Sequence, residues 1–345
     1  MINSTIRNLA IGLCVALACA TPATAADVDP QLIARAKQEG QLVYYTDLIV
    51  DQIVRPLISG FEAKYGIKVT FTRGDSQVNS IKLLNEYRAG RVIADVFGLT
   101  SGMEVLIESG AVAQFSTRNS DELPPQYRDP DRYWVSSHLF VMQPGYNTGL
   151  VPAAQRPKAY DDLLLPYWKD KMVWKTNDMS GGPGFIGNVL THMGEARGMD
   201  YLRKLSGQKI KMVNASARAV LDQVIAGEYP MALQIFNHHA AISADKGAPV
   251  DWVRLSPATV NPGLVGLPKG APHPNAGRLF IEFMTSKEGQ QLFQKAGYLP
   301  ARPDVPPLKP ELIPETGGFA ANVITPALTS KAMNSWDKVF AGLFR

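Results

Sequence analysis

The sequence has only two cysteines, Cys14 and Cys19, and both lie near its start. The rest of the chain therefore has no thiol with which to form a disulfide or a cysteine-ligated metal site. It also has no apolar run of about 20 residues, the length that a membrane-spanning helix needs. The 35 Lys and Arg residues nearly balance the 31 Asp and Glu residues, without a long basic run. This balance argues against a nucleic acid or a membrane surface as partner.

The first 25 residues differ in composition from the remainder. Arg7 is their only charged side chain, an apolar run covers Leu9 to Ala20, and Ala23-Thr24-Ala25 has the small-x-small pattern of a cleavage site. The residues before Cys19 do not have the usual order of a lipoprotein box, which argues against lipidation. The pattern predicts a cleaved signal peptide over 1–25 and a soluble periplasmic protein.

Two lobes are expected, because the roughly 320 residues after the signal exceed what one hydrophobic core usually serves. Short runs rich in β-branched and aromatic residues alternate with segments of helical period, a pattern typical of an α/β protein with parallel sheets. Strands at 41–46, 67–74 and 94–99 are each followed by a helix. Gly66 and Gly90 end the first two helices.

The long hydrophobic stretch at 133–148 indicates the crossing into the second lobe, where strands and helices alternate again. A Pro-rich connection after residue 299 leads to C-terminal helices. The predicted first lobe is 26–132 plus 262–299, the second is 133–261, and the connection with its helices is 300–345.

Several segments together resemble the ferric-iron-binding branch of the extracellular solute-binding proteins (family 1), which also includes phosphonate and sugar-phosphate receptors. The resemblance implies the two-lobed type II periplasmic binding protein fold, with hinge strands and a ligand in the interlobe cleft. It also implies docking on the permease of an ABC importer at the inner membrane, and we expect the protein to be a monomer. The segments are "QLVYYT", "ADVFGL", "YNT", "YWKDKMVW", "VGLPKGAPHPNAGRLFIEFMTSKEGQQLF" and "SWDKVF".

The resemblance also bears on the cargo, because iron-binding members place two adjacent tyrosines in the cleft after the strand that corresponds to 229–235. Here the sequence at that point is Asn237-His238-His239. Phenolate is a hard anionic donor suited to ferric iron, whereas neutral imidazole favours zinc, copper, nickel or ferrous iron. The replacement argues against ferric iron.

The same three residues fit an anion site. We predict Asn237 as the N-cap of a short helix that places His238 and His239 in its first turn, where backbone N–H groups and the helix dipole favour negative charge. Adjacent helical residues diverge by about 100°, so the alternative is that only one ring faces the cleft.

Other strand-to-helix turns supply Gly and hydroxyl residues that would meet at the same cleft. The same residue types are ordinary helix caps, so only their convergence points to a ligand. Asp47 and Asp75 would repel a pure anion unless they point away or face an ammonium or hydroxyl group of the ligand. The predicted ligand-binding residues are Thr46, Asp47, Ser76, Thr100, Ser101, Tyr146, Ser180, Gly181, Gly182, Asn237, His238 and His239.

The sequence therefore predicts a substrate-binding protein, without cofactor or catalysis, for a small organic anion such as 2-aminoethylphosphonate. One alternative is a receptor for ferric or another transition-metal ion, with His238 and His239 as ligands. The other is an exported hydrolase or metal enzyme. The chain lacks a G-x-S-x-G elbow, however, and its remaining histidines lie in unrelated segments. The run at 182–187 matches a dinucleotide-binding fingerprint, but no acidic residue ends the next strand.

Overall fold

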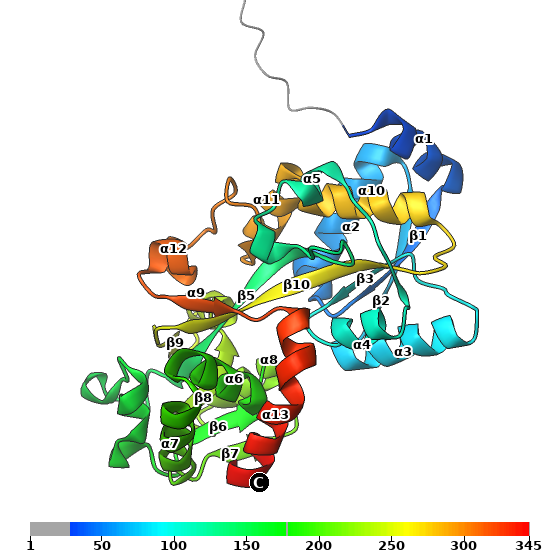
Figure 1. Ribbon diagram of the computed structural model, residues 1–345. Helices are drawn as coiled ribbons and strands as arrows, with labels where there is room; N and C mark the ends of the chain where they lie inside the picture. The colour runs from blue at the N-terminus through cyan, green and yellow to red at the C-terminus, as the bar shows by residue number, and fades with distance from the viewer. Residues whose placement is uncertain (1–27, 177–178, 345) are drawn as a thin grey trace, which may run out of the picture.

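The computed structural model describes residues 28–176 and 179–344, so the predicted signal peptide and both cysteines lie outside the described residues. Figure 1 shows two lobes joined by two long strands, β5 (Val135–Asn147) and β10 (Ala258–Pro268). The predicted two-lobed α/β fold is confirmed. Within the described part of the chain, no helix is both long enough and apolar enough to cross a membrane.

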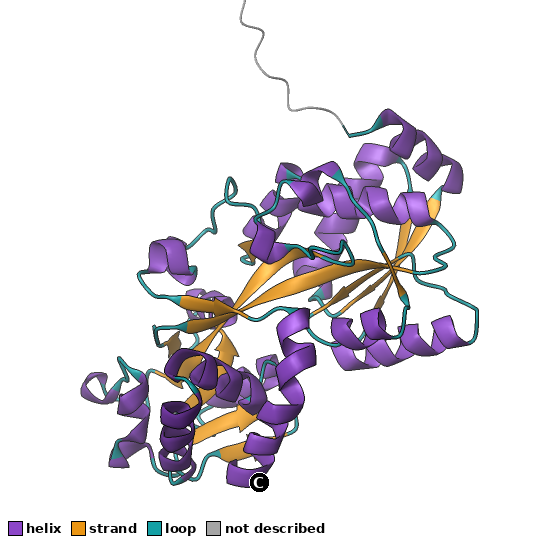
Figure 2. Ribbon diagram, viewed as in Figure 1, coloured by secondary structure: helices purple, strands orange, loops and turns teal. Residues whose placement is uncertain are grey.

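The first lobe is built around three parallel strands with helices on both faces (Figure 2). Phe61 and Phe280 meet edge to face with ring centroids 4.9 Å apart. This contact packs a helix from the N-terminal part of the chain against a helix that follows the second lobe in the sequence. The strands are β1 (Gln41–Thr46), β2 (Lys68–Arg73) and β3 (Val96–Leu99), with the short β4 (Val112–Ala113) and β11 (Leu299–Pro300). The helices are α1 (Pro30–Glu39), α2 (Arg55–Tyr65), α3 (Ser76–Arg88), α4 (Met103–Glu108), α5 (Arg118–Asp121), α10 (Pro274–Thr285) and α11 (Lys287–Lys295).

The second lobe repeats this arrangement on a smaller scale. The aromatic side chains of Trp168 and Trp174 are fully buried in its core. Gly194, with a positive φ of 76°, ends one helix of this lobe and begins the next. The strands are β6 (Met172–Lys175), β7 (Lys211–Val213), β8 (Met231–Phe236) and β9 (Val250–Trp252). The helices are α6 (Gly182–Met193), α7 (Glu195–Ser206), α8 (Ala217–Ile225) and α9 (Asn237–Asp245).

One continuous sheet passes through both lobes in the order β2-β1-β3-β10-β5-β8-β6-β7. The prediction of parallel sheets holds within each lobe but is wrong where the lobes join. There β10 runs antiparallel to both β3 and β5, and β5 runs antiparallel to β8. The reason is geometric, because β5 carries the chain out of the first lobe and β10 carries it back.

The C-terminal helix α13 (Pro326–Phe344) packs on α6 and α7 of the second lobe and also contacts α4 of the first. Trp336 and Phe340 lie against α6, where a Cβ atom added to Gly187 would be 2.7 Å from the Trp336 ring. A Cβ atom added to Gly182 would likewise lie too close to the Phe340 ring. Two further short elements, α12 (Pro314–Gly317) and β12 (Ala321–Val323), precede this helix.

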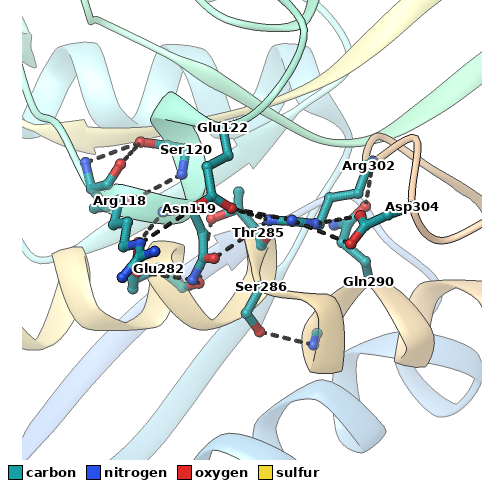
Figure 3. A network of polar contacts seen from close by, with 12 residues as sticks. Arg118, Asn119, Ser120, Glu122, Glu282, Thr285, Ser286, Gln290, Arg302 and Asp304 are labelled. Atoms are coloured by element: carbon teal, nitrogen blue, oxygen red, sulfur yellow. Dashed lines mark hydrogen bonds and ion pairs between the residues drawn. The ribbon is translucent and has the colours of Figure 1, made fainter. Parts of the chain in front are cut away.

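A polar network ties the chain that follows β11 to the outer side of the first lobe (Figure 3). Arg302 pairs with Asp304 at 2.8 Å and with Glu122 at 3.2 Å, which joins the loop to the end of α5. Glu282 on α10 accepts hydrogen bonds from the backbone and side-chain amides of Asn119. The first residues after the predicted lobe boundary are thus attached to the first lobe.

Candidate ligand-binding cleft

A cavity of about 200 Å³ lies between the lobes, where strands of both lobes end. The loops after β1, β2 and β3 line it from the first lobe, and the segments after β6, β7 and β8 line it from the second. Carboxyl ends of strands are the usual ligand position in open α/β sheets. Six of the predicted site residues line this cavity: Asp47, Ser76, Thr100, Ser101, Ser180 and His239.

A hydrogen-bond network around Asp47 organises the first-lobe wall. The Asp47 carboxylate accepts from the backbone N–H of Thr100 at 3.0 Å, from the Thr100 hydroxyl at 2.6 Å and from the Ser76 hydroxyl. Burial raises the pKa of Asp47, while these hydrogen bonds act in the opposite direction. The network joins three strand ends, so these residues hold the shape of the wall as well as line it.

Three basic side chains reach the cavity from three different elements. Arg73 is the last residue of β2, Lys175 is the last residue of β6, and Arg218 is in the first turn of α8. Lys175 is buried, and its ammonium group lies 3.1 Å from the Ser180 hydroxyl. Asp222 holds the Arg218 guanidinium at 2.7 Å. Positive charge from both lobes therefore faces one small space.

The two adjacent histidines have different surroundings. His239 lines the interlobe cavity, whereas His238 lines a separate cavity together with Ile242 and Leu312. Burial, with a smaller contribution from nearby Arg218, lowers the pKa of His239 to about 3. The ring is therefore neutral at physiological pH. It can donate one N–H hydrogen bond to a ligand without carrying a charge.

Residues 44–299 match the family of bacterial extracellular solute-binding proteins. The chain is a bacterial extracellular solute-binding protein. The match runs from β1 to β11, so it includes both lobes and every loop that lines the interlobe cavity.

The individual relatives of this solute-binding protein include iron-binding and sugar-phosphate-binding proteins. The resemblance to this family that the sequence indicated is therefore confirmed. The Fe(3+)-binding periplasmic protein of Serratia marcescens is 26% identical over 272 residues, 71% of this chain and 73% of that protein. The Trichodesmium protein IdiA (FutA), in complex with iron and citrate, is 18% identical with a TM-score of 0.73 over 89% of this chain and 100% of that chain. AfuA from Actinobacillus pleuropneumoniae, with fructose-6-phosphate bound, is 20% identical with a TM-score of 0.72 over 88% and 98%. At this identity the solved structures establish the fold and leave the cargo open.

The position of His239 leads to a test by substitution. His239→Ala is expected to weaken binding of an oxyanion ligand by about 1.5–3 kcal/mol, the range for a hydrogen bond to a charged group. Because burial keeps the ring neutral, the ratio of parent to variant affinity should stay constant between about pH 5.5 and 8. Calorimetry on both proteins at several pH values measures this ratio and cancels the titration of the ligand itself.

His238→Ala is the matched control, because this ring is buried outside the ligand cavity. The control should lower thermal stability but leave affinity near that of the parent. An affinity ratio for His239→Ala that falls steeply above about pH 6.5 would instead indicate a protonated ring.

Several predicted site residues of this solute-binding protein lie elsewhere. The prediction that Tyr146 lines the cleft is wrong, because its hydroxyl donates to Asp251 at 3.1 Å beside another cavity. Thr46 is fully buried, and its hydroxyl accepts from the backbone N–H of Leu48 within the loop after β1. Thr46 directly precedes Asp47, which does line the cavity, and Tyr146 lies further along β5 than Phe140, which also lines it.

The predicted roles of Asn237, Gly181 and Gly182 also need correction. Asn237 is the first residue of α9 and does not cap it, because its side-chain amide donates to the carbonyl of Leu312 at 2.8 Å. Gly181 and Gly182 begin α6 but do not line the cavity. The absence of a side chain at Gly182 instead allows Phe340 of α13 to pack closely.

Sequence reasoning missed the basic residues and Tyr298, which also lines the cavity. A signal existed for Arg73 and Lys175, because each ends a predicted strand and therefore lies at the ligand edge of the sheet. Arg218 also had a signal, because it follows a strand and comes two residues after Ser216, the N-cap of α8. No local pattern indicates Tyr298, which reaches the cavity only after the chain has returned from the second lobe.

Among the residues that the structure describes, no group of three or more His, Cys, Asp or Glu side chains is arranged to hold a metal ion. The two adjacent histidines lie with their ring centroids 4.3 Å apart, but they line different cavities. The predicted alternative of a metal held by both His238 and His239 therefore finds no support in their placement.

Proposed function

We propose that this protein is the periplasmic receptor of an ABC importer. It captures a small organic anion with a phosphonate or phosphate-ester group, such as 2-aminoethylphosphonate, and delivers it to the permease as a monomer. The observation that carries this proposal is the convergence of Arg73, Lys175 and Arg218 on one cavity from both lobes. An oxyanion between the lobes gains charge-assisted hydrogen bonds from each side, which favours the closed form.

The acidic residues of the cavity support a ligand that also carries a positive or hydroxyl group. The Asp47 carboxylate already accepts three hydrogen bonds from its neighbours. Asp75 is exposed, and its carboxylate accepts only the backbone N–H of Gln77 among the hydrogen bonds of the described residues. Asp75 is therefore the better placed of the two to meet the ammonium group of an aminoalkylphosphonate.

Ferric iron is the second candidate, because the Serratia marcescens relative is an Fe(3+)-binding protein. The cavity of this chain contains one phenol, Tyr298, and burial raises its pKa and so disfavours the phenolate form. The tyrosine pair found in the iron-binding branch is absent at the end of β8. Three basic side chains at the cavity also oppose a trivalent cation without a bound anion.

The proposed function is tested on protein purified without refolding. Native mass spectrometry should find a retained organic anion, and calorimetry with 2-aminoethylphosphonate should show saturable one-to-one binding. Ferric citrate added to the same sample should give no visible phenolate-to-iron charge-transfer band, because the tyrosine pair is missing. A coloured protein with stoichiometric iron, or a parent protein that binds neither phosphonate nor phosphate esters, would contradict the proposal.

A further inference from the structure

A second cavity of about 560 Å³ adjoins the first one. The two share three lining residues, Thr100, Ser101 and Met179, so they meet at these residues between the lobes. The first cavity holds the basic side chains, whereas the second extends beside β10 toward α3, α4 and the start of α13. Ligand pockets for small molecules typically occupy about 300–1,000 Å³, so the combined space exceeds what a bare oxyanion needs.

The second cavity contains a polar side chain with no partner in the described part of the chain. Asn261 of β10 is 3% exposed, and neither its amide nitrogen nor its carbonyl oxygen has a hydrogen-bond partner there. Asn261 pairs directly with Phe140 of β5, and side chains opposite each other in an antiparallel pair lie on the same face of the sheet. Since Phe140 lines the first cavity, Asn261 faces the cleft at the junction of the two.

An unpartnered buried carboxamide costs about 1–3 kcal/mol, which favours a role in the liganded state. The walls around it carry apolar side chains from both helices, with Ile81 of α3 and Val105 of α4 both more than 45% exposed. A cavity that combines apolar walls with polar side chains suits the carbon body of a ligand that carries hydroxyl or carbonyl groups. Further apolar lining comes from Leu84, Leu264, Ile324, Pro326 and Met333, and further polar lining comes from Gln77, Ser80, Glu104, Thr325, Thr329 and Asp337.

We infer that Asn261 determines specificity by hydrogen bonding to a hydroxyl or carbonyl group on the body of an organic phosphate or phosphonate. This inference rests on the proposed function, because the basic side chains must hold the anionic group. The preferred ligand class is then an anion whose body is about as large as a phosphorylated sugar. Inorganic phosphate would occupy the first cavity alone.

The test uses the full-length mature protein, Asn261→Leu, and three probes measured by calorimetry: inorganic phosphate, hexyl phosphate and fructose 6-phosphate. Leucine is similar in size to asparagine but cannot hydrogen bond. The variant should bind fructose 6-phosphate at least about tenfold more weakly than the parent does, because the ligand hydroxyl loses its partner. Its affinity for inorganic phosphate and for hexyl phosphate should change by less than about twofold.

Thermal melting without ligand distinguishes a role of Asn261 in ligand specificity from a role in the stability of the fold. Because Asn261 has no partner among the described residues, Asn261→Leu should melt at the same temperature as the parent or higher, whereas a structural asparagine would lower it. Thr259→Val is the matched control, since Thr259 is buried on the same face of β10 but lines neither cavity. The control should bind all three probes like the parent.

Two results would overturn the inference while the proposed function stands. One is a parent that binds 2-aminoethylphosphonate but neither organic phosphate. The other is an Asn261→Leu variant with the parent's affinity for fructose 6-phosphate. A parent that binds no phosphonate, phosphate or ester would instead overturn the proposed function.

Discussion

Replacement of Lys175 by methionine is expected to weaken binding of 2-aminoethylphosphonate by about 3 kcal/mol, roughly a hundredfold, because removal of a buried charged partner costs 2–5 kcal/mol. Lys175 is only 7% exposed at the end of β6, so water cannot replace its ammonium group beside the ligand. Methionine keeps the length of the side chain and removes the charge. Calorimetry of parent and variant at low ionic strength measures the loss.

Lys211→Met provides the matched control for this substitution. Lys211 begins the neighbouring strand β7 and is exposed, and it does not line the interlobe cavity. The control removes the same charge from the same sheet and should leave affinity within about twofold of the parent. Equal losses in the two variants would mean that net charge, rather than the buried ammonium group, drives binding.

Trp336→Ala is expected to lower the free energy of unfolding by about 3–5 kcal/mol, the range for large aromatic side chains removed from a core. Trp336 is 4% exposed and packs on Gly187 of α6, where no side chain fills the space that would be left. The loss should appear as a lower midpoint in urea and a lower melting temperature.

Lys338→Ala is the control that shows whether the loss of stability comes from the lost packing of Trp336 or from any substitution in α13. Lys338 is exposed on the same helix, two residues further along, and its replacement should change the free energy of unfolding by less than about 0.5 kcal/mol. If Trp336→Ala unfolds at the same urea concentration as Lys338→Ala, α13 does not stabilise the second lobe through this contact.

Much of the fold could be predicted because its signals are local. The β-branched and aromatic residues of "QLVYYT" predict β1 at 41–46, which is where the strand lies. Gly66 was expected to end a helix, and it follows α2 with a φ of 71° that favours glycine. These features depend on neighbours a few residues away. The antiparallel joining of β5 and β10 depends on the course of the whole chain, so periodicity alone did not indicate it.

The site was predicted less completely, because side-chain direction depends on partners that are remote in sequence. Asparagine is a residue type that often caps helices, but the side-chain amide of Asn237 donates a hydrogen bond to the carbonyl of Leu312 instead. Adjacent histidines look equivalent in sequence, yet only His239 reaches the cavity. Ser76, Thr100 and Ser180 were placed correctly because the ends of strands fix the positions of the residues that follow them.

The position of β10 in the sheet has a consequence for how the chain is made. Leu99 at the end of β3 pairs with Leu264, and the entire second lobe lies between them in the sequence. During synthesis the three parallel strands of the first lobe are therefore complete long before their antiparallel neighbour exists, and one side of β3 stays open. The second lobe contains β6, β7 and β8 in one uninterrupted segment, so this part of its sheet forms without any later strand, although α13 packs on the lobe only at the end of synthesis. The sheet of the lobe that begins the chain is thus completed after the parallel strands of the second lobe, by contacts of high sequence separation that form slowly.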